Sequence, residues 1–227
     1  MGWKANSILI CADDPAYFSS RPEIDHAKAK ALLDHLVGPN KGTFEATTSF
    51  SDSVWPEPNC WAIGAYEKGY AISTRERNNF VVDVPRQVLK LIPNPYVLCI
   101  GLHSVSNYAG FAYYEKGKWV RRFASTQVDG LEVVEEGEKL PEEQAFWDRF
   151  SYTNEGWIEC DAAGAKRRSD CAMGEDLVFA VCKKFLGMLV EEDGFYEGND
   201  EEMFSSVFAV DVFRLPKKPW WKFSWTG

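Results

Sequence analysis

The stretches Tyr66-Glu67-Lys68-Gly69 and Tyr114-Glu115-Lys116-Gly117 decide the fold of this chain, because each one predicts a β-hairpin. Each stretch lies between two runs of apolar and aromatic residues. A charged Glu-Lys pair followed by Gly suits a short hairpin loop, since Gly readily takes the positive φ angle that a bulged turn needs. Two such hairpins indicate an antiparallel sheet at the centre of the molecule.

Apolar runs elsewhere in the chain predict the strands that complete this sheet. A run with apolar residues at successive positions, such as Tyr96–Leu102, is typical of a strand that is covered on both faces. Ser7–Ala12 has the same character and predicts a buried opening strand. The expected strands are Ser7–Ala12, Thr43–Ser49, Cys60–Tyr66, Tyr70–Arg75, Tyr96–Leu102, Ala109–Tyr114, Lys118–Ala124 and Val207–Leu215.

Helices are expected where an apolar stripe lies between a start signal and a stop signal. The first stripe follows Ser20-Arg21-Pro22-Glu23, which has capping-box spacing, and ends at Gly38-Pro39. Further helices are predicted after Asp83-Val84-Pro85, at Pro141–Phe150 and at Glu175–Val190. The chain is therefore predicted to be an α+β protein, with a largely antiparallel sheet, two β-hairpins and three or four helices that pack on it.

No change of composition marks a linker, so we interpret residues 1–227 as a single α+β domain. Residues 217–227 form a Trp-rich C-terminal tail, which we expect to dock on the body or to make a homo-oligomer contact through Trp220–Trp225. The alternative is two halves, 1–128 and 129–227. The segment Ser151–Ala172 is polar and contains Gly, and it is predicted to be a long loop or an excursion from the body.

The net charge of −9 is unevenly distributed along the chain. Residues 1–128 carry 14 Lys and Arg against 12 Asp and Glu, whereas residues 129–227 carry 11 against 22. An acidic surface repels phosphate backbones, which argues against nucleic-acid binding, and it attracts basic protein partners. A solvated face that keeps the protein soluble is the alternative interpretation of the same charges.

Cysteine usage and hydropathy predict a cytoplasmic protein. None of the six cysteines forms a Cys-x-x-Cys pair, and several lie within apolar runs, which favours free thiols in a reducing compartment. The apolar run before Asp13-Asp14 is too short for a secretory signal. Charged residues interrupt every apolar segment before the ~18 residues that a membrane span requires, so we expect no membrane insertion.

Asp13-Asp14 is the first candidate for chemistry, because it directly follows the predicted opening strand. Adjacent carboxylates at the end of a strand are able to hold a divalent cation such as Mg²⁺, which prefers oxygen ligands. The alternative interpretation is a turn in which the Asp side chains accept hydrogen bonds from backbone N–H groups.

His103 is the second candidate, because it directly follows the predicted strand Tyr96–Leu102 and precedes Ser104 and Asn107. An imidazole in such a place is suited to proton transfer or ligand binding, and equally to a structural hydrogen bond. His26 and His35 point to opposite faces of the first predicted helix, and we interpret both as surface residues.

Two functional hypotheses follow, because the nucleotide-binding, zinc-protease and EF-hand motifs are all absent and no cofactor is predicted. The first is a non-catalytic interaction protein of the cytoplasm, whose acidic C-terminal half binds a basic protein partner. The alternative is a hydrolase, with or without a divalent metal, that uses Asp13, Asp14 and His103. This alternative requires the three side chains to meet in one cleft.

About half of the chain resembles a bacterial family catalogued as a domain of unknown function. The similar motifs are Met1-Gly2-Trp3-Lys4, Leu9–Asp14, His103-Ser104-Val105, Gly117-Lys118-Trp119-Val120-Arg121 and Gly137–Trp147. The chain departs from that family in the segment Ser151–Ala172 and in the Trp-rich tail. The resemblance implies a bacterial, cytoplasmic protein, and it brings no activity, cofactor or site residue.

Overall fold

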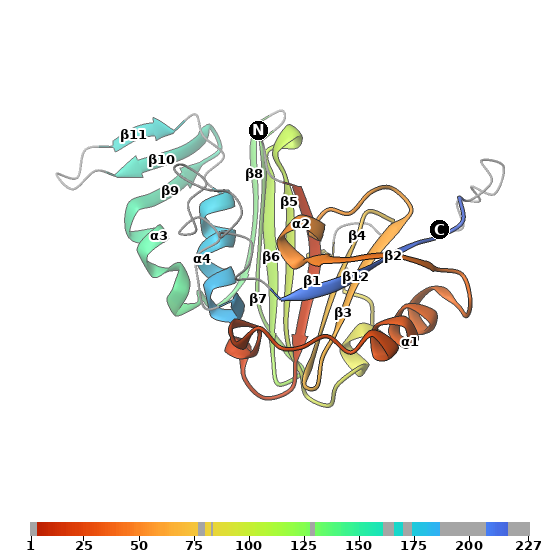
Figure 1. Ribbon diagram of the computed structural model, residues 1–227. Coiled ribbons are helices and arrows are strands. Elements are labelled where there is room, and N and C mark those ends of the chain that lie inside the picture. Colours follow the sequence, from red (N-terminus) through yellow and green to blue (C-terminus); the bar gives the residue numbers. More distant parts are fainter. Residues whose placement is uncertain are drawn as a thin grey trace, which may run out of the picture.

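A nine-stranded antiparallel sheet is the centre of the computed structural model (Figure 1). The structure describes residues 4–76, 80–82, 84–127, 130–160, 166–169, 174–186 and 208–217. The strand order in the sheet is β2-β12-β3-β4-β1-β5-β6-β7-β8. These strands are β1 (Lys4–Cys11), β2 (Thr43–Ser49), β3 (Cys60–Ala65), β4 (Gly69–Thr74), β5 (Tyr96–His103), β6 (Tyr108–Glu115), β7 (Lys118–Gln127), β8 (Leu131–Gly137) and β12 (Ala209–Arg214).

The strand β1 lies in the middle of this sheet, between β4 and β5, and pairs antiparallel with both. Its residues Ile8, Leu9 and Ile10 are all 0% exposed, as expected for an apolar run that is covered on both faces. The hairpin β3–β4 lies on one side of β1, and the hairpin β6–β7 follows β5 on the other side. Both predicted hairpins are therefore confirmed, and they flank the opening strand.

The two hairpins use their glycines for different physical reasons. In β6–β7, Lys116 and Gly117 take positive φ angles of 50° and 73°, which is the conformation that the sequence predicted for a bulged turn. Gly69 of the first hairpin is not among the residues with positive φ. A Cβ atom there would lie 2.8 Å from the backbone oxygen of Ile10, so close packing on β1 requires the glycine.

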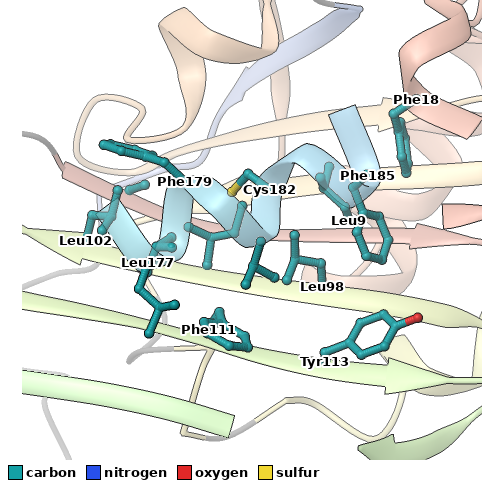
Figure 2. Close-up of a cluster of buried hydrophobic side chains, with 14 of the residues drawn as sticks. Leu9, Phe18, Leu98, Leu102, Phe111, Tyr113, Leu177, Phe179, Cys182 and Phe185 are labelled. Atoms are coloured by element: carbon teal, nitrogen blue, oxygen red, sulfur yellow. The ribbon is translucent and has the colours of Figure 1, made fainter. Parts of the chain in front are cut away.

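Helices cover the two faces of the sheet. Among the described residues the helices are α1 (His26–Val37), α2 (Phe50–Ser53), α3 (Gln144–Arg149) and α4 (Gly174–Leu186), with 3-10 turns at η1 (Pro15–Ser20), η2 (Val88–Lys90), η3 (Ser104–Ser106) and η4 (Pro141–Glu143). On one face α4 contacts β5, β6, η1 and η4, and on the other face α1 contacts β3. Figure 2 shows α4 packed on the sheet, with Leu177 toward Leu102 and Phe111 and with Phe185 near Tyr113.

The first helix begins later than the sequence predicted. Asp25, and not Ser20, is its N-cap, because the Asp25 side chain accepts a hydrogen bond of 2.9 Å from the backbone N–H of Lys28. Ser20 instead ends η1, and Arg21 then turns the chain with a φ angle of 52°. The helix ends at Gly38 as predicted, with a φ angle of 96°.

Three other expectations need correction. The strand β8 was not predicted, and it forms one edge of the sheet. The segment Ser151–Ala172 was expected to be a long loop or an excursion, and it contributes strands to a separate three-stranded antiparallel sheet made of β9 (Phe150–Thr153), β10 (Gly156–Cys160) and β11 (Lys166–Ser169). The helix expected after Asp83 is only the short turn η2. The structure is therefore mainly antiparallel β, with few helices.

The contact predicted for Trp220–Trp225 lies outside the described residues, as do Met1–Trp3. In the described part of the chain, no helix combines the length and the apolar character that a membrane span requires.

We expect Leu98→Ala to lower the free energy of unfolding by about 2–5 kcal/mol, because it leaves a cavity in a core that cannot fully collapse. Leu98 is 0% exposed and lies under α4. Chemical denaturation measures the change. The control is Val105→Ala, at a position that is 79% exposed, which we expect to stay within about 0.5 kcal/mol of the wild type. An equal effect of both substitutions would contradict the assignment of Leu98 to the core.

Candidate functional site

Asp13 and Asp14 form the turn that follows β1. Oδ1 of Asp14 accepts a hydrogen bond of 2.9 Å from the backbone N–H of Ala16, which makes Asp14 the N-cap of η1. The carboxylate of Asp13 lies 3.2 Å from Nζ of Lys68 in the first hairpin. Both Asp residues are exposed. These contacts are those of the turn interpretation of the pair. A cation would have to bind the carboxylate oxygens that make neither contact.

His103 and these carboxylates lie at opposite ends of the paired strands β1 and β5. It is the last residue of β5 and pairs with Lys4, whereas Cys11 pairs with Tyr96 at the other end of the same ladder. The seven steps from Lys4 to Cys11 span about 23 Å at the usual rise of ~3.3 Å per residue. The structure therefore does not bring Asp13 and Asp14 together with His103 in one cleft.

The surroundings of His103 are those of a hydrogen-bonded structural residue. Its Nδ1 lies 3.1 Å from Oγ of Ser106, and the ring centroids of His103 and Trp55 are 5.8 Å apart. Ser106 also donates a hydrogen bond to the backbone oxygen of His103 at 3.2 Å. These contacts close the short turn η3 that joins β5 to β6.

The cysteines described by the structure are all free thiols, and four of them are buried: Cys11, Cys60, Cys99 and Cys182. Burial raises the pKa of the Cys11 thiol to about 12, with a further contribution from the nearby carboxylates of Asp14 and Asp13. Burial alone raises the pKa of Cys182 to about 12. A thiol with such a pKa carries almost no thiolate at neutral pH, and thiolate is the reactive form. These cysteines therefore serve as core residues.

A contact between His26 and Asp211 was not visible in the sequence. Nδ1 of His26 lies 3.0 and 2.9 Å from the two carboxylate oxygens of Asp211, and the hydroxyl of Thr47 donates to the same carboxylate at 2.7 Å. The side chain of Asp211 is 1% exposed, whereas that of His26 is 63% exposed. The contact ties the first turn of α1 to β12 and provides the buried carboxylate with hydrogen-bond donors.

The geometry of this contact orients the imidazole of His26. A carboxylate that accepts from Nδ1 leaves Nε2 as the free ring nitrogen. A single oriented imidazole is too few ligands for a metal centre. No group of three or more His, Cys, Asp or Glu residues is arranged to hold a metal ion in the part of the chain that the structure describes. The His26–Asp211 pair is therefore an anchor of the fold.

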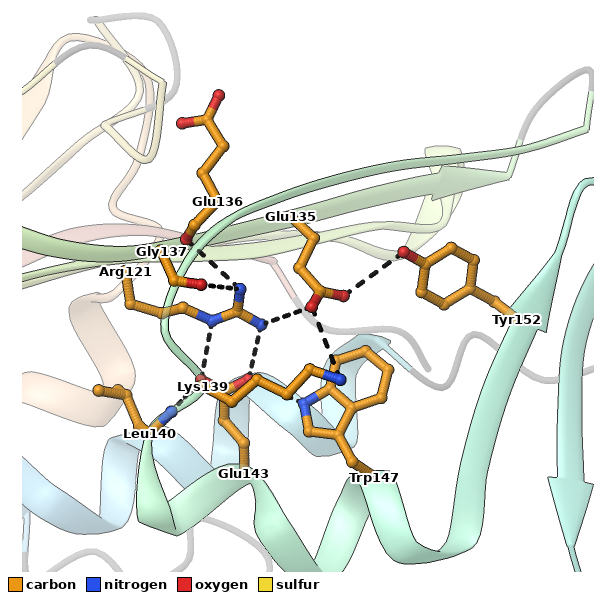
Figure 3. A network of polar contacts seen from close by, with 9 residues as sticks. All are labelled: Arg121, Glu135, Glu136, Gly137, Lys139, Leu140, Glu143, Trp147 and Tyr152. Atoms are coloured by element: carbon orange, nitrogen blue, oxygen red, sulfur yellow. Dashed lines mark hydrogen bonds and ion pairs between the residues drawn. The ribbon is translucent and has the colours of Figure 1, made fainter.

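A buried ion pair connects β7 to the end of η4 (Figure 3). Arg121 and Glu143 are both 0% exposed, and two parallel hydrogen bonds of 2.9 and 2.8 Å join the guanidinium to the carboxylate. Nη1 of Arg121 also donates to the backbone oxygens of Glu136 and Gly137 in β8, at 3.4 Å each. Such bidentate pairs fix the orientation of both side chains.

Further donors complete the coordination of the buried carboxylate and extend the network to the surface. The backbone N–H of Leu140 and Nε1 of Trp147 each donate to Glu143 at 2.8 Å. Arg121 also lies 3.5 Å from Glu135, whose carboxylate accepts from the hydroxyl of Tyr152 at 3.4 Å (Figure 3). The network therefore holds the edge strand β8, the turn η4, the helix α3 and the small sheet in fixed positions.

The edge strand β8 presents acidic side chains above this network. Leu131 and Val133 turn toward the core, whereas Glu132, Val134 and Glu136 alternate with them and point to the other face. All three of these outward residues are exposed, and Val134 is exposed to 45%. In the described part of the chain, no strand pairs with the outer side of β8. This acidic edge strand is the candidate functional site.

The features above define a mainly antiparallel β protein whose acidic edge strand β8 has no strand paired to its outer side among the described residues. The chain belongs to DUF6928, a family of unknown function, whose model matches residues 6–154. This match confirms the resemblance to a family of unknown function. The matched residues include both hairpins and the acidic edge strand β8, whereas α4 and β12 follow them. No curated protein and no solved structure matches the chain.

We expect Arg121→Met to lower the free energy of unfolding by about 3–5 kcal/mol, because it leaves the buried carboxylate of Glu143 without its counter-charge. Denaturation followed by Trp fluorescence measures the loss. The matched control is the double variant Arg121→Met/Glu143→Gln, in which both charges are gone. It should be destabilised by less than the sum of the two single variants. If the losses of stability in the two single variants added up to the loss in the double variant, a direct coupling between Arg121 and Glu143 would be contradicted.

We expect Cys11, Cys99 and Cys182 to resist iodoacetamide at about pH 8 while the protein is folded, because their burial keeps the thiols protonated and inaccessible. Cys160, which is partly exposed, should be alkylated first among the described cysteines. Peptide mass spectrometry after a timed reaction gives the extent at each site. Full alkylation in guanidinium is the control. Rapid reaction of Cys99 in the folded protein would contradict this placement.

Proposed function

We propose that this protein is a non-catalytic interaction protein, and that it binds a basic segment of a partner protein along the acidic edge strand β8. The observation that carries the proposal is the exposed row Glu132, Val134 and Glu136 beside the unpaired side of the strand. An edge strand offers unpaired backbone N–H and C=O groups, and an added strand uses them to extend the sheet.

The charges of the edge select what can pair with it. Carboxylates on an edge strand repel a second copy of an acidic chain, and this chain has a net charge of −9. The same carboxylates attract a strand with Lys or Arg at alternate positions. A partner with Lys, then Val, then Lys on one face would place cations opposite Glu132 and Glu136 and an apolar side chain opposite Val134.

The rigid support of the edge favours binding over plain solvation. Nη1 of Arg121 bonds the backbone at the end of β8, and Arg122 pairs with Glu136 at 2.6 Å. A strand that is already held in extended form loses little conformational entropy when a partner adds to it.

Since Glu136 is partly neutralised by Arg122, Glu132 carries more of the free negative charge.

The hydrolase alternative finds less support, because Asp13 and Asp14 follow the Cys11 end of β1, whereas His103 pairs with Lys4 at the other end. The two ends of the strand are about 23 Å apart. General acid and base groups must reach one substrate. For the location, we propose the cytoplasm of a bacterial cell. The free, buried thiols support a reducing compartment, and the bacterial family that the chain resembles supports the source.

A labelled decapeptide with the pattern Lys-x-Val-x-Lys tests the function by fluorescence anisotropy. We expect binding that weakens steeply between about 50 and 500 mM salt, since screening acts on exposed charges. Glu132→Lys should raise Kd about tenfold, which corresponds to ~1.4 kcal/mol. The matched control is Glu57→Lys, which makes the same charge change at an exposed position in the loop before β3.

A second peptide, N-methylated at alternate residues, separates strand addition from simple charge attraction. It keeps every charge and lacks backbone donors on one side, so it should bind at least tenfold more weakly if the partner extends the sheet. Equal binding of both peptides would remove the strand-addition part of the proposal. Failure of every basic peptide to bind, or binding that is equally strong in Glu132→Lys, would overturn the function.

A further inference from the structure

An exposed imidazole that a buried carboxylate orients is a second candidate for chemistry, separate from the acidic edge strand. His26 is the first residue of α1 and its side chain is 63% exposed, whereas the side chain of Asp211 on β12 is 1% exposed. Nδ1 of His26 lies 3.0 and 2.9 Å from the two oxygens of that carboxylate. The strand β12 is next to one edge of the sheet, and β8 forms the other edge.

The contact determines which nitrogen of the His26 ring carries the proton. A carboxylate only accepts hydrogen bonds, so Nδ1 must be the donor. In the neutral ring, Nε2 then has the free lone pair. No described residue forms a hydrogen bond with Nε2. The nitrogen that can act as a nucleophile is therefore the one that the contact leaves open to solvent.

The same carboxylate stabilises a positive charge on the ring. An imidazole that attacks an electrophile through Nε2 keeps its proton on Nδ1 and becomes cationic, and the oxygens of Asp211 lie beside that proton. A buried Asp stabilises the imidazolium of hydrolase triads in this way. The hydroxyl of Thr47 donates to the carboxylate of Asp211 at 2.7 Å and fixes its orientation. The ring of His26 is thus arranged as a nucleophile before any reagent arrives.

The adjacent carboxylate on α1 does not compete for this ring. Asp25 accepts a hydrogen bond of 2.9 Å from the backbone N–H of Lys28, and its other oxygen lies 3.6 Å from Nζ of the same lysine. Its charge is therefore partly compensated by its own helix. An anionic reagent that approaches Nε2 meets a carboxylate that already has a counter-charge.

The contacts of His26 favour phosphoryl transfer over acyl transfer. Acyl transfer depends on donors that hold a developing oxyanion, and the described contacts of His26 include none. A phosphoryl group passes through a loose transition state, for which an aligned nucleophile matters more than covalent assistance. An exposed and oriented Nε2 meets that requirement.

We propose that Nε2 of His26 accepts a phosphoryl group from a phosphoramidate, a donor in which phosphorus is bonded to nitrogen. The lone pair of Nε2 forms the new N–P bond while the P–N bond of the donor breaks. The amine of the donor leaves with that electron pair. The proton on Nδ1 stays in place, and Asp211 balances the charge of the phosphorylated ring. The anchor between α1 and β12 is therefore kept in the product.

Phosphoramidate itself, added to the full chain at neutral pH, tests this proposal. The samples are then kept alkaline, because phosphohistidine is labile to acid. Peptide mass spectrometry gives the extent of reaction at each of the three histidines. Phosphorus NMR distinguishes the Nε2 product from the Nδ1 product.

His35 is the internal comparison for His26. It is exposed in the last turn of the same helix, and no described carboxylate pairs with its ring. We expect His26 to react about tenfold faster than His35, since an oriented ring with a carboxylate partner is the better nucleophile. The product at His26 should be at Nε2 alone. Equal rates at the two histidines, or an Nδ1 product at His26, would overturn the proposal.

Substitutions separate the reactivity of His26 from its anchoring role. Asp211→Asn keeps an oxygen that accepts from Nδ1 and removes the charge, so the reaction at His26 should slow to about the rate at His35. The matched control is Thr47→Val, which removes the other donor to the carboxylate. It should lower the melting temperature and leave the rate at His26 unchanged.

Thermal melting shows whether each variant is folded. A folded Asp211→Asn variant that reacts as fast as the wild type would overturn the proposal, because the carboxylate would then not activate the ring. If Asp211→Asn does not fold, the comparison of His26 with His35 in the wild type decides. His26→Gln, whose amide keeps a donor for Asp211, should lose the fast reaction. A fast reaction that persists in His26→Gln would assign it to another residue and overturn the site.

Discussion

The strand β1 is the constraint on which the rest of the structure depends. It has neighbours on both edges and cores on both faces, so that its residues Ile8, Leu9 and Ile10 have no exposed surface. At about 25 cal/mol per Å² of apolar surface, the burial of these side chains stabilises the fold from both faces of the sheet. The hairpin β3–β4 covers one edge of β1, and the hairpin β6–β7 extends the sheet beyond β5. The position of every other layer follows from this arrangement.

The C-terminal part of the chain completes the sheet that the N-terminal part begins. Within the described residues, β2 pairs only with β12, which lies between β2 and β3. Asp211 of β12 binds His26 and Thr47, and α4 covers the core above β5 and β6. Both β12 and α4 follow residue 154, where the match to the DUF6928 family model ends. The matched region alone would leave β2 without its strand partner β12 and would remove α4 from one face of the core.

The sequence predicted the features that depend on neighbouring residues. Local patterns were sufficient for both hairpins, for β1 and for the end of α1 at Gly38. The start of α1 was wrong, because two acceptable caps occur and the one at Asp25 also lets its backbone N–H bond Ala65 in β3 at 2.7 Å. The strand β8 was missed since its Glu residues are uncommon in strands, and pairing with β7 overrides that preference.

Contacts between distant parts of the chain explain why the candidate sites could not be read from the sequence. Asp13 and His103 each directly follow a predicted strand, and the antiparallel register of β1 and β5 places the ends of these strands far apart. The pairs His26–Asp211 and Arg121–Glu143 join residues that no motif connects. The sequence also does not distinguish a buried carboxylate from an exposed one. The acidic residues counted in the second half therefore included Glu143 and Asp211, which are buried and cannot contact a partner protein.

The distribution of charge in the fold has a physical consequence for the acidic edge strand β8. Arg121 neutralises Glu143 inside the protein, and Lys30 compensates Asp34 on α1. On β8, Glu135 lies beside Arg121 and Glu136 pairs with Arg122, which leaves Glu132 as the uncompensated carboxylate of the strand. Fields from exposed charges fade within about 10 Å at 0.1 M salt. A partner at this edge of the sheet would therefore meet the local charge of Glu132 more than the net charge of −9 of the whole chain.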